Sequence, residues 1–280
     1  MALKLMVIAP WSGLGDRMFV IGSCIRFARK MGIPYKLAWI NSSALTCPLD
    51  MLFRCPVETY DLNSFVWNGW GNIDVDPKKG YSNSNIWVIK DGNELTNEMM
   101  SCPDVLIING WAIPMDPYEK TYRDDKIFQD ILVESVGMIM EWPLNPYVES
   151  ERDRFVGQYA LSKCLGVHFR DGDLKCDVGY GTNRIIPLSR YFNTLDKRGE
   201  NLFLATDSEE AESEFLKRYG DRVCMYRCRT KNRAEPEAIQ DALIQMILLS
   251  RCSRILCGRS NFNLAAQCMG RMAHVEFEKE

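Results

Sequence analysis

The order of apolar and polar positions at the start of the chain predicts a strand, a turn and a helix. An apolar run at 3–9 is typical of a buried strand, and the glycine-containing segment 12–15 indicates a turn. Over 17–31, apolar residues recur at helical spacing along one face; they are Met18, Ile21, Ile25 and Ala28. A glycine and a proline end this helix, and a second strand is predicted over 35–40. This is the pattern of a Rossmann-like unit.

The rest of the first half is less regular. Residues 60–102 are rich in Asn, Gly, Asp and Ser, and we expect an irregular insertion with one strand at 86–90. A strand at 105–109 and a helix at 118–140 follow. The prolines of the segment 141–146 then indicate a linker.

The second half alternates strands and helices more clearly. The predicted strands are 165–169, 201–205, 222–226, 254–257 and 273–277, and the predicted helices are 208–219, 235–250 and 261–269. Such alternation predicts a parallel sheet covered by helices on both faces. We therefore expect two Rossmann-like domains, 1–143 and 144–280.

Composition and charge narrow the classes of partner. The 280 residues are 46% hydrophobic and 25% charged, which is an ordinary globular balance with enough apolar residues for two cores. A net charge of -3 argues against nucleic acid as a partner but leaves room for a local cationic pocket. The opening apolar run is too short to span a bilayer, and no signal peptide or membrane anchor is evident. We expect a cytoplasmic protein without a membrane span, or a trimmed form of a longer one.

The cysteines argue against a metal site. There are 11, an odd number, and none are paired as Cys-x-x-Cys, the spacing that a zinc site would need. Several lie in apolar runs, where a reduced thiol behaves as a small hydrophobic side chain. We expect reduced cysteines in a reducing compartment and no metal.

Candidate chemistry lies where a predicted strand of the second half breaks into a charged loop. Arg170 directly follows the strand at 165–169. Because ligands of parallel sheets lie at the carboxyl ends of strands, its planar guanidinium can bind a diphosphate there. Asp173 would orient that guanidinium or bind a sugar. The alternative is a surface ion pair between Arg170 and a nearby Asp.

Two further strand ends carry related residues. Asp207 follows the strand at 201–205 and either lies beside a nucleotide or, like Ser208, caps the next helix. The start of the helix at 261–269 offers free N–H groups and a favourable dipole to an anion. Its candidate residues are Ser260, Asn261 and Phe262, the last of which either stacks on a ligand or belongs to the core.

These segments together resemble the peptide motifs of α1,6-fucosyltransferases, bacterial nodulation fucosyltransferases and protein O-fucosyltransferases. The matched residues are His168, Arg170 and Asp173 of the His-x-Arg-x-x-Asp motif, Ala205–Ser208 of an Ala-Thr-Asp-Ser strand end, and Leu249–Ser250 with Ser260–Phe262 of a helix–strand–turn segment. A helix containing Pro187 and Tyr191 also falls where the family has one. The resemblance covers roughly residues 164 to 270.

The first half carries a glycine-rich loop similar to the family's Gly-x-Gly-Asn-Arg. The matching residues are Gly13, Leu14, Gly15 and Arg17, with Asp16 where Asn is usual. Asp16 would reach the fucose or the acceptor hydroxyl, or would cap the helix. Met18 replaces the third glycine of a dinucleotide fingerprint, which disfavours a dehydrogenase.

A second departure concerns the helix before the last motif. The family places an acid where this chain has Gln245, and Asp241 lies one turn earlier on the same face. Recognition of the nucleotide on that side therefore stays open.

The resemblance implies an α/β, GT-B-like fold whose two Rossmann-like domains face a cleft, with the acceptor on the first and the donor on the second. It also implies GDP-fucose as donor substrate, a glycan or glycoprotein acceptor, inversion at the anomeric carbon and no metal. Arg170 and the helix start at Ser260 would stabilise the leaving diphosphate. Asp171-Gly172-Asp173 looks like a metal-binding D-x-D, but it overlaps the Arg motif and we interpret it as coincidence.

Asp16 and Asp177 are the candidates for the base that takes the acceptor proton, although a strongly cationic transition state would need little base assistance. The open alternatives are a GT-B transferase using another nucleotide sugar, such as GDP-mannose, and a non-catalytic glycan- or nucleotide-binding relative. All 7 tryptophans lie in the first 142 residues, where they either pack or stack on an acceptor sugar; Trp67 and Trp70 are the candidates for stacking.

Overall fold

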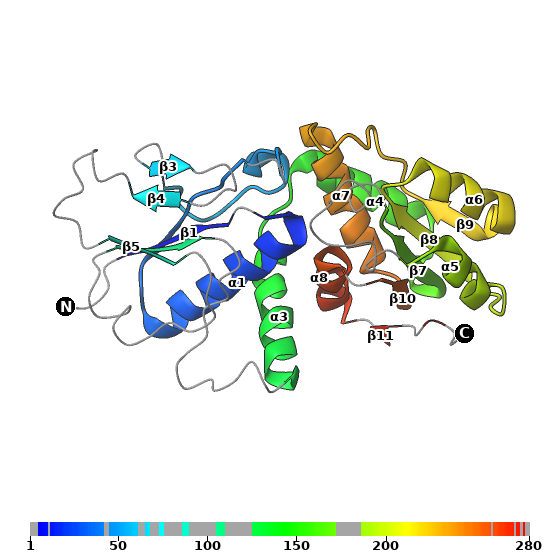
Figure 1. Cartoon of the computed structure of the whole chain (residues 1–280), viewed down its shortest axis with the longest axis horizontal. Helices are drawn as coiled ribbons and strands as arrows, with labels where there is room; N and C mark the ends of the chain where they lie inside the picture. The colour runs from blue at the N-terminus through cyan, green and yellow to red at the C-terminus, as the bar shows by residue number, and fades with distance from the viewer. Residues whose placement is uncertain are drawn as a thin grey trace. The chain divides into compact units, whose positions relative to one another are not determined.

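The computed structural model describes the following residues: 5–10, 12–41, 45–60, 65–67, 73–75, 86–89, 105–109, 125–171, 186–258, 260–271, 273–274 and 277. The chain divides into two compact units, Met1–Asn145 (unit 1) and Pro146–Glu280 (unit 2). Each unit is built on a parallel sheet of its own (Figure 1).

The sheet of unit 1 has the order β2-β1-β6-β5, and all its neighbouring strands are parallel. Its strands are β1 (Leu5–Ala9), β2 (Tyr35–Leu37), β5 (Ile86–Ile89) and β6 (Val105–Asn109). Strand β1 lies between β2 and β6, and its apolar side chains are buried from Met6 onward. The strands at 86–90 and 105–109 are confirmed, whereas β2 ends three residues before the predicted position, at Leu37.

The predicted insertion at 60–102 contains a short antiparallel pair that the sequence did not reveal. Strand β3 (Phe65–Trp67) pairs with β4 (Ile73–Val75). Strands of three residues show too little alternation to be recognised from a hydrophobic pattern.

Two helices of unit 1 pack against each other, α1 (Leu14–Met31) and α3 (Asp125–Met140). Helix α1 begins three residues earlier than predicted, because the backbone of Gly13 acts as N-cap and the amide of Arg17 donates to the Gly13 carbonyl. The glycine-rich segment is therefore partly helical. Helix α1 ends at Gly32, which adopts the left-handed conformation (φ 66°) common at helix ends.

Unit 2 has the strand order β11-β10-β7-β8-β9, again with parallel neighbours. The strands are β7 (Cys164–Phe169), β8 (Asn201–Thr206), β9 (Val223–Met225), β10 (Arg254–Cys257) and β11 (Ala273–His274). All five strands predicted in this half are present, and the first four end within one residue of the prediction.

The helices of unit 2 are α4 (Pro146–Gln158), α5 (Leu188–Leu195), α6 (Glu209–Tyr219), α7 (Pro236–Leu249) and α8 (Asn261–Gly270). Short 3-10 helices in the described chain are Leu49–Met51, Leu161–Lys163 and Gly220–Arg222. Helix α4 was not predicted. Only its Val148 and Phe155 are buried, so it lacks the apolar stripe that reveals a helix in a sequence.

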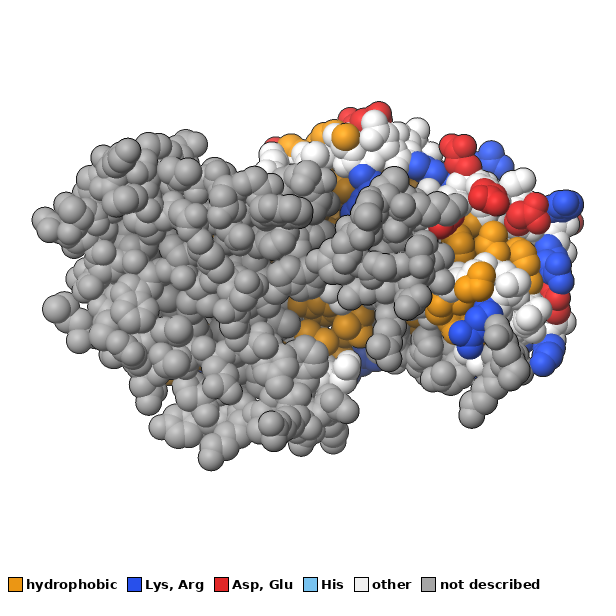
Figure 2. Space-filling model, viewed as in Figure 1, with side chains coloured by type: hydrophobic (Ala, Val, Ile, Leu, Met, Phe, Trp, Pro, Cys, Tyr) orange, Lys and Arg blue, Asp and Glu red, His pale blue; other side chains and the backbone are white. Residues whose placement is uncertain are grey.

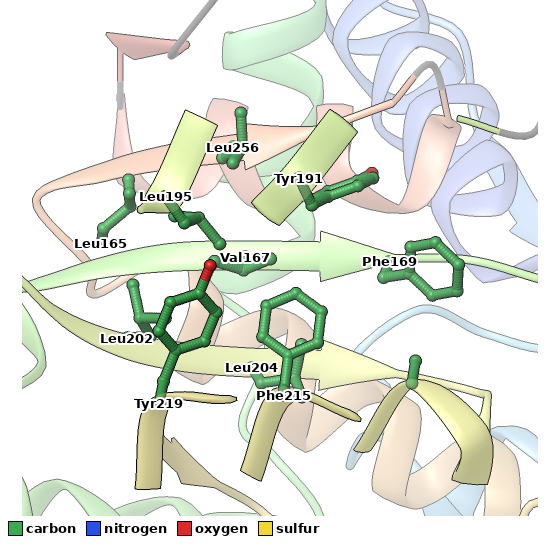
Figure 3. Packing of buried hydrophobic residues seen from close by; sticks show 11 residues of the cluster. Leu165, Val167, Phe169, Tyr191, Leu195, Leu202, Leu204, Phe215, Tyr219 and Leu256 are labelled. Atoms are coloured by element: carbon green, nitrogen blue, oxygen red, sulfur yellow. The ribbon is translucent and has the colours of Figure 1, made fainter. Parts of the chain in front are cut away.

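The sheet of unit 2 is covered on both faces, as predicted. On one face α5 and α6 complete a hydrophobic cluster, shown in Figure 3, that consists of Leu165, Val167, Phe169, Tyr191, Leu195, Leu202, Leu204, Ala211, Phe215, Tyr219 and Leu256. Between Leu202 and Leu204, the side chain of Phe203 points to the opposite face and contacts the Phe155 ring of α4. Helix α7 packs on the same sheet and against α4.

The described surface of unit 2 carries both signs of charge. On the face shown in Figure 2, basic and acidic side chains are interspersed. Arg218 pairs with Asp196, and Lys217 pairs with Glu214 at 3.9 Å. No described helix is both long enough and apolar enough to cross a membrane.

Candidate functional site

Three strand ends meet at one edge of the sheet in unit 2. Strand β7 lies between β10 and β8, and the registers Cys257↔His168 and Phe169↔Thr206 bring the carboxyl ends of the three strands level. The segments that follow these strands therefore lie side by side, although they are far apart in the sequence. In an open parallel sheet this edge is where ligands bind.

Arg170 and Ser260 are brought together at this edge. The Nη1 atom of Arg170 donates to the Ser260 hydroxyl at 3.3 Å, across 90 positions of sequence. Ser260 is also the N-cap of α8, and its hydroxyl accepts from the backbone N–H of Phe262 at 3.2 Å. A guanidinium and a helix N-terminus, with Asn261 as its first residue, thus share one location. Both favour an anion.

The rings of His168 and Phe262 stack on each other next to the contact of Arg170 with Ser260. His168 lies within β7 and is buried, and its ring stacks on that of Phe262 with centroids 4.8 Å apart and planes 21° apart. The stack joins the end of β7 to the first turn of α8. The Phe262 ring therefore contacts protein rather than standing free for a ligand on that face.

Asp207 links the ends of β7 and β8. Its Oδ1 accepts the backbone N–H of Asp171 at 3.0 Å. The N-cap of α6 is Ser208, whose hydroxyl accepts from the N–H of Ala211 at 3.2 Å. The capping alternative is therefore wrong for Asp207 and correct for Ser208. The carboxylate of Asp207 instead holds the residue next to Arg170.

Tyr191 is a component to which sequence reasoning assigned no role. Its hydroxyl donates to the His168 carbonyl at 3.0 Å and accepts the Gly258 N–H at 3.1 Å. Burial raises the pKa of Tyr191, so the hydroxyl stays protonated. On the other side of Gly258, the buried Asn263 side chain donates to its carbonyl at 2.6 Å. The sequence predicts Tyr191 in a helix similar to one of the fucosyltransferase families, but no local sequence pattern indicates that its hydroxyl bonds to His168 and Gly258.

The glycine-rich loop belongs to unit 1. Leu14 and Gly15 are buried in the first turn of α1, and Asp16 lies in the same turn and is partly exposed. Because Gly13 is the N-cap, the alternative that Asp16 caps the helix is wrong. A carboxylate in a first helical turn is favourably placed toward the helix dipole.

Arg17 holds the shape of this loop. Its side chain is fully buried, and its Nε donates to the Ser12 carbonyl at 2.6 Å. The guanidinium lies 4.5 Å from the centroid of the Trp39 ring, and the Trp39 indole donates to the Cys47 carbonyl at 2.9 Å. Burial lowers the pKa of Arg17 to about 9, which leaves it cationic at neutral pH.

Gln245 and Asp241 have separate partners within unit 2. The Gln245 side chain is buried and donates to the Tyr226 carbonyl at 3.2 Å. Asp241 is fully buried and accepts from Arg229, through its backbone N–H at 2.6 Å and its Nη2 at 2.8 Å. Arg229 also lies over the Tyr147 ring at 4.2 Å. Asp241 thus anchors the segment after β9.

Other predicted residues lie outside the described part of the chain. Asp173, Asp177, Trp70 and the side chain of Trp67 are among them. Within the described ranges, no group of three or more His, Cys, Asp or Glu side chains is placed to hold a metal ion. The described cysteines are free thiols: Cys24, Cys47, Cys55, Cys164, Cys224, Cys228, Cys252, Cys257 and Cys268.

Comparison with known proteins gives a result at the level of structure. No protein-family model and no curated protein matches the chain. NodZ α-1,6-fucosyltransferase, in crystals soaked with GDP-fucose, matches with a TM-score of 0.62 and 16% identity over 95% of this chain and 92% of that chain.

Two further structures were determined in complex with GDP. A mutant of FUT1 from Arabidopsis thaliana matches with a TM-score of 0.55 and 12% identity over 97% of this chain and 69% of that chain. POFUT1 matches with a TM-score of 0.53 and 11% identity over 99% of each chain. The chain therefore has an α/β fold with parallel sheets that is similar, over nearly its full length, to the GT-B structures of fucosyltransferases.

Proposed function

We propose that this chain is an inverting, metal-independent fucosyltransferase that transfers fucose from GDP-fucose to a glycan or protein acceptor. The observation that carries the proposal is the contact of Arg170 with Ser260 at the N-terminus of α8. It lies at the carboxyl edge of a parallel sheet, in a fold similar to that of fucosyltransferases crystallised with GDP or GDP-fucose. The donor is assigned to residues 144–280 and the acceptor to 1–143.

The chemistry of the leaving group supports this assignment. As the fucosyl bond breaks, negative charge grows on the departing diphosphate. The Arg170 guanidinium and the positive end of the α8 dipole would stabilise that charge. Ser260 holds the guanidinium and Asp207 holds the adjacent backbone, so little reorganisation would accompany the reaction. Asp173 would orient Arg170 or bind the sugar.

Acceptor activation is assigned to a carboxylate. Asp16, in the first turn of α1, and Asp177 are the proposed bases that take the proton of the acceptor hydroxyl. We also assign the Gly13–Gly15 segment to donor binding, with Arg17 holding the shape of that segment. A fucosyl transition state with strong cationic character would place only a modest demand on the base.

Calorimetric titration of GDP into wild type and Arg170→Ala tests the proposal. Charge-assisted hydrogen bonds contribute roughly 1.5–3 kcal/mol each, so GDP binding should weaken by at least about tenfold. Transfer should be abolished while the circular dichroism spectrum is unchanged. Arg218→Ala is the control. The Arg218 guanidinium pairs with Asp196, the C-cap residue of α5, and not with the segments at the carboxyl ends of the strands. Equal GDP affinity of wild type and Arg170→Ala would reject the diphosphate assignment.

A thermal-shift panel separates the remaining alternatives. GDP and GDP-fucose should raise the melting temperature, and UDP-sugars and NAD should not. Stabilisation by UDP-sugars but not by GDP would reject GDP-fucose as the donor. Greater stabilisation by GDP-mannose than by GDP-fucose would favour a transferase that uses another nucleotide sugar. Release of fucose from GDP-fucose distinguishes an enzyme from a non-catalytic relative that only binds the nucleotide.

A further inference from the structure

We infer that Tyr191 is a positioning residue that locks the two anion-binding elements of the proposed donor site to each other. The inference rests on the proposed function and deepens it. Tyr191 belongs to α5 and to neither anion-binding element, and its side chain is buried. Its single hydroxyl nevertheless bonds to both elements, at the His168 carbonyl and the Gly258 N–H.

The positions of the two bonds explain why one hydroxyl has this effect. His168 lies two residues before Arg170, and Gly258 lies two residues before Ser260. The pairing of β7 with β10 ends at Cys257↔His168, so the strands no longer hold each other beyond that point. The Tyr191 hydroxyl bridges the two strands there, just before the segments that contain Arg170 and Ser260. Because a phenol both donates and accepts, it can satisfy the two backbone groups at once.

Packing fixes the Tyr191 ring independently of its hydroxyl. The ring meets Phe169 edge-on with centroids 5.4 Å apart, and Phe277 in the same manner at 4.8 Å (Figure 3 shows Tyr191 and Phe169). The hydroxyl is thus held at a set position by the hydrophobic cluster. A Cβ added at Gly258 would lie 3.3 Å from Ile186 and 3.8 Å from the hydroxyl, so the turn approaches Tyr191 closely.

The consequence for the site follows from the contact of Arg170 with Ser260. At 3.3 Å this hydrogen bond is already long, and a displacement of the α8 turn by a few tenths of an ångström would remove it. Without the Tyr191 bridge, the stack of His168 on Phe262 would still join the two elements, but Arg170 and the α8 N-terminus would be held to each other less tightly. A diphosphate would then have to order both elements when it binds, which weakens its binding.

The test compares two variants that each remove one phenolic hydroxyl from the same cluster. Tyr219→Phe is the matched control, because Tyr219 donates to Asp196 at 2.9 Å instead of to the site. Both variants should lower the melting temperature. Only Tyr191→Phe should weaken GDP binding, by about tenfold, or about 1.4 kcal/mol, and lower kcat/KM for transfer accordingly. Wild-type GDP affinity and kcat/KM in Tyr191→Phe would mean that Tyr191 is merely structural and would overturn the inference.

A double-mutant cycle with Ser260→Ala tests the coupling directly. If Tyr191 acts by holding the α8 turn against Arg170, Ser260→Ala should weaken GDP binding less in the Tyr191→Phe background than in wild type. Additive effects on GDP affinity would contradict the coupling.

Hydrogen exchange without any ligand separates failure of this inference from failure of the proposed function. Amides of 168–171 and 257–262 should exchange faster in Tyr191→Phe than in wild type, and not in Tyr219→Phe. If wild type binds no GDP, the proposed function fails, and the exchange rates still decide whether Tyr191 couples the two segments. Unchanged exchange in both segments would overturn the coupling.

Discussion

Ser260 combines two roles that can be separated by experiment. As N-cap of α8 it stabilises a helix, and as partner of Arg170 it orients a cation. We expect Ser260→Ala to lower the free energy of unfolding by about 1 kcal/mol through loss of the cap. It should also weaken GDP binding, measured by calorimetry, because the guanidinium loses its anchor.

Ser208→Ala provides the matched control for that prediction. Ser208 caps α6 with a hydroxyl bond to the Ala211 N–H, so the same chemical group is lost from an equivalent position. Urea denaturation should give a similar loss of stability for both variants. A comparable loss of GDP affinity in both would contradict the specific role of Ser260.

The buried Arg17 shows how a residue of the glycine-rich segment can be structural. Its guanidinium contacts Ser12 and Trp39 within unit 1, and burial lowers its pKa. A sequence motif identifies such a residue, but it does not distinguish a side chain that binds a ligand from one that shapes the loop. Burial and partners make that distinction.

At the scale of elements, helices α1 and α3 approach each other closely at Gly22. A Cβ added there would lie 2.0 Å from the Ser135 carbonyl oxygen, which belongs to the backbone of α3. We expect Gly22→Ala to destabilise unit 1 by about 3 kcal/mol or more, because α1 and α3 would have to separate. Thermal unfolding followed by circular dichroism would measure the effect.

Gly137→Ala is the control on the partner helix. Gly137 is exposed in α3, and an added Cβ would meet nothing within 4 Å. Because alanine is the better helix former, this variant should be more stable by about 0.5–1 kcal/mol. A Gly22→Ala protein as stable as wild type would show that the helices are not packed as closely as described.

Elements with strong periodicity could be predicted, and those without it could not. The strands at Cys164–Phe169 and Arg254–Cys257 are short apolar runs bounded by polar loops, and their ends were predicted closely. Helix α4 buries only Val148 and Phe155, which lie two helical turns apart. Two buried apolar residues so far apart do not distinguish a helix from a polar loop in the sequence alone.

At the scale of the whole molecule, buried thiols make stability depend on pH. Burial raises the pKa of Cys257 and of Cys268 to about 11, from the value of 9.0 for an exposed thiol. The unfolded chain therefore loses these protons at lower pH than the folded chain. This contribution to stability is fully present below about pH 9 and is lost as the pH rises toward about 11.

Urea denaturation at about pH 8 and about pH 10 checks this sign. The free energy of unfolding should fall over that interval by about 1 kcal/mol for each thiol of this kind. Cys257→Ala should reduce the fall of the unfolding free energy with pH, because it removes one of the titrating groups. A fall unaffected by that substitution would contradict the contribution of Cys257.

The sequence by itself determined much of the local structure and the positions of the candidate chemistry. Period and turn residues are local properties, so they were enough to place Arg170 directly after a strand and Ser260 at a helix start. They also predicted parallel sheets, because strands alternate with helices.

Only the tertiary structure decided which of these residues meet. The strand order β10-β7-β8 is a non-local property, and it brings Arg170 to Ser260 and Asp171 to Asp207. The Tyr191 bridge depends on α5 packing over that sheet, which no local pattern specifies. Free energy gained by burying side chains from distant segments selects these contacts, so they become visible only when the chain is folded.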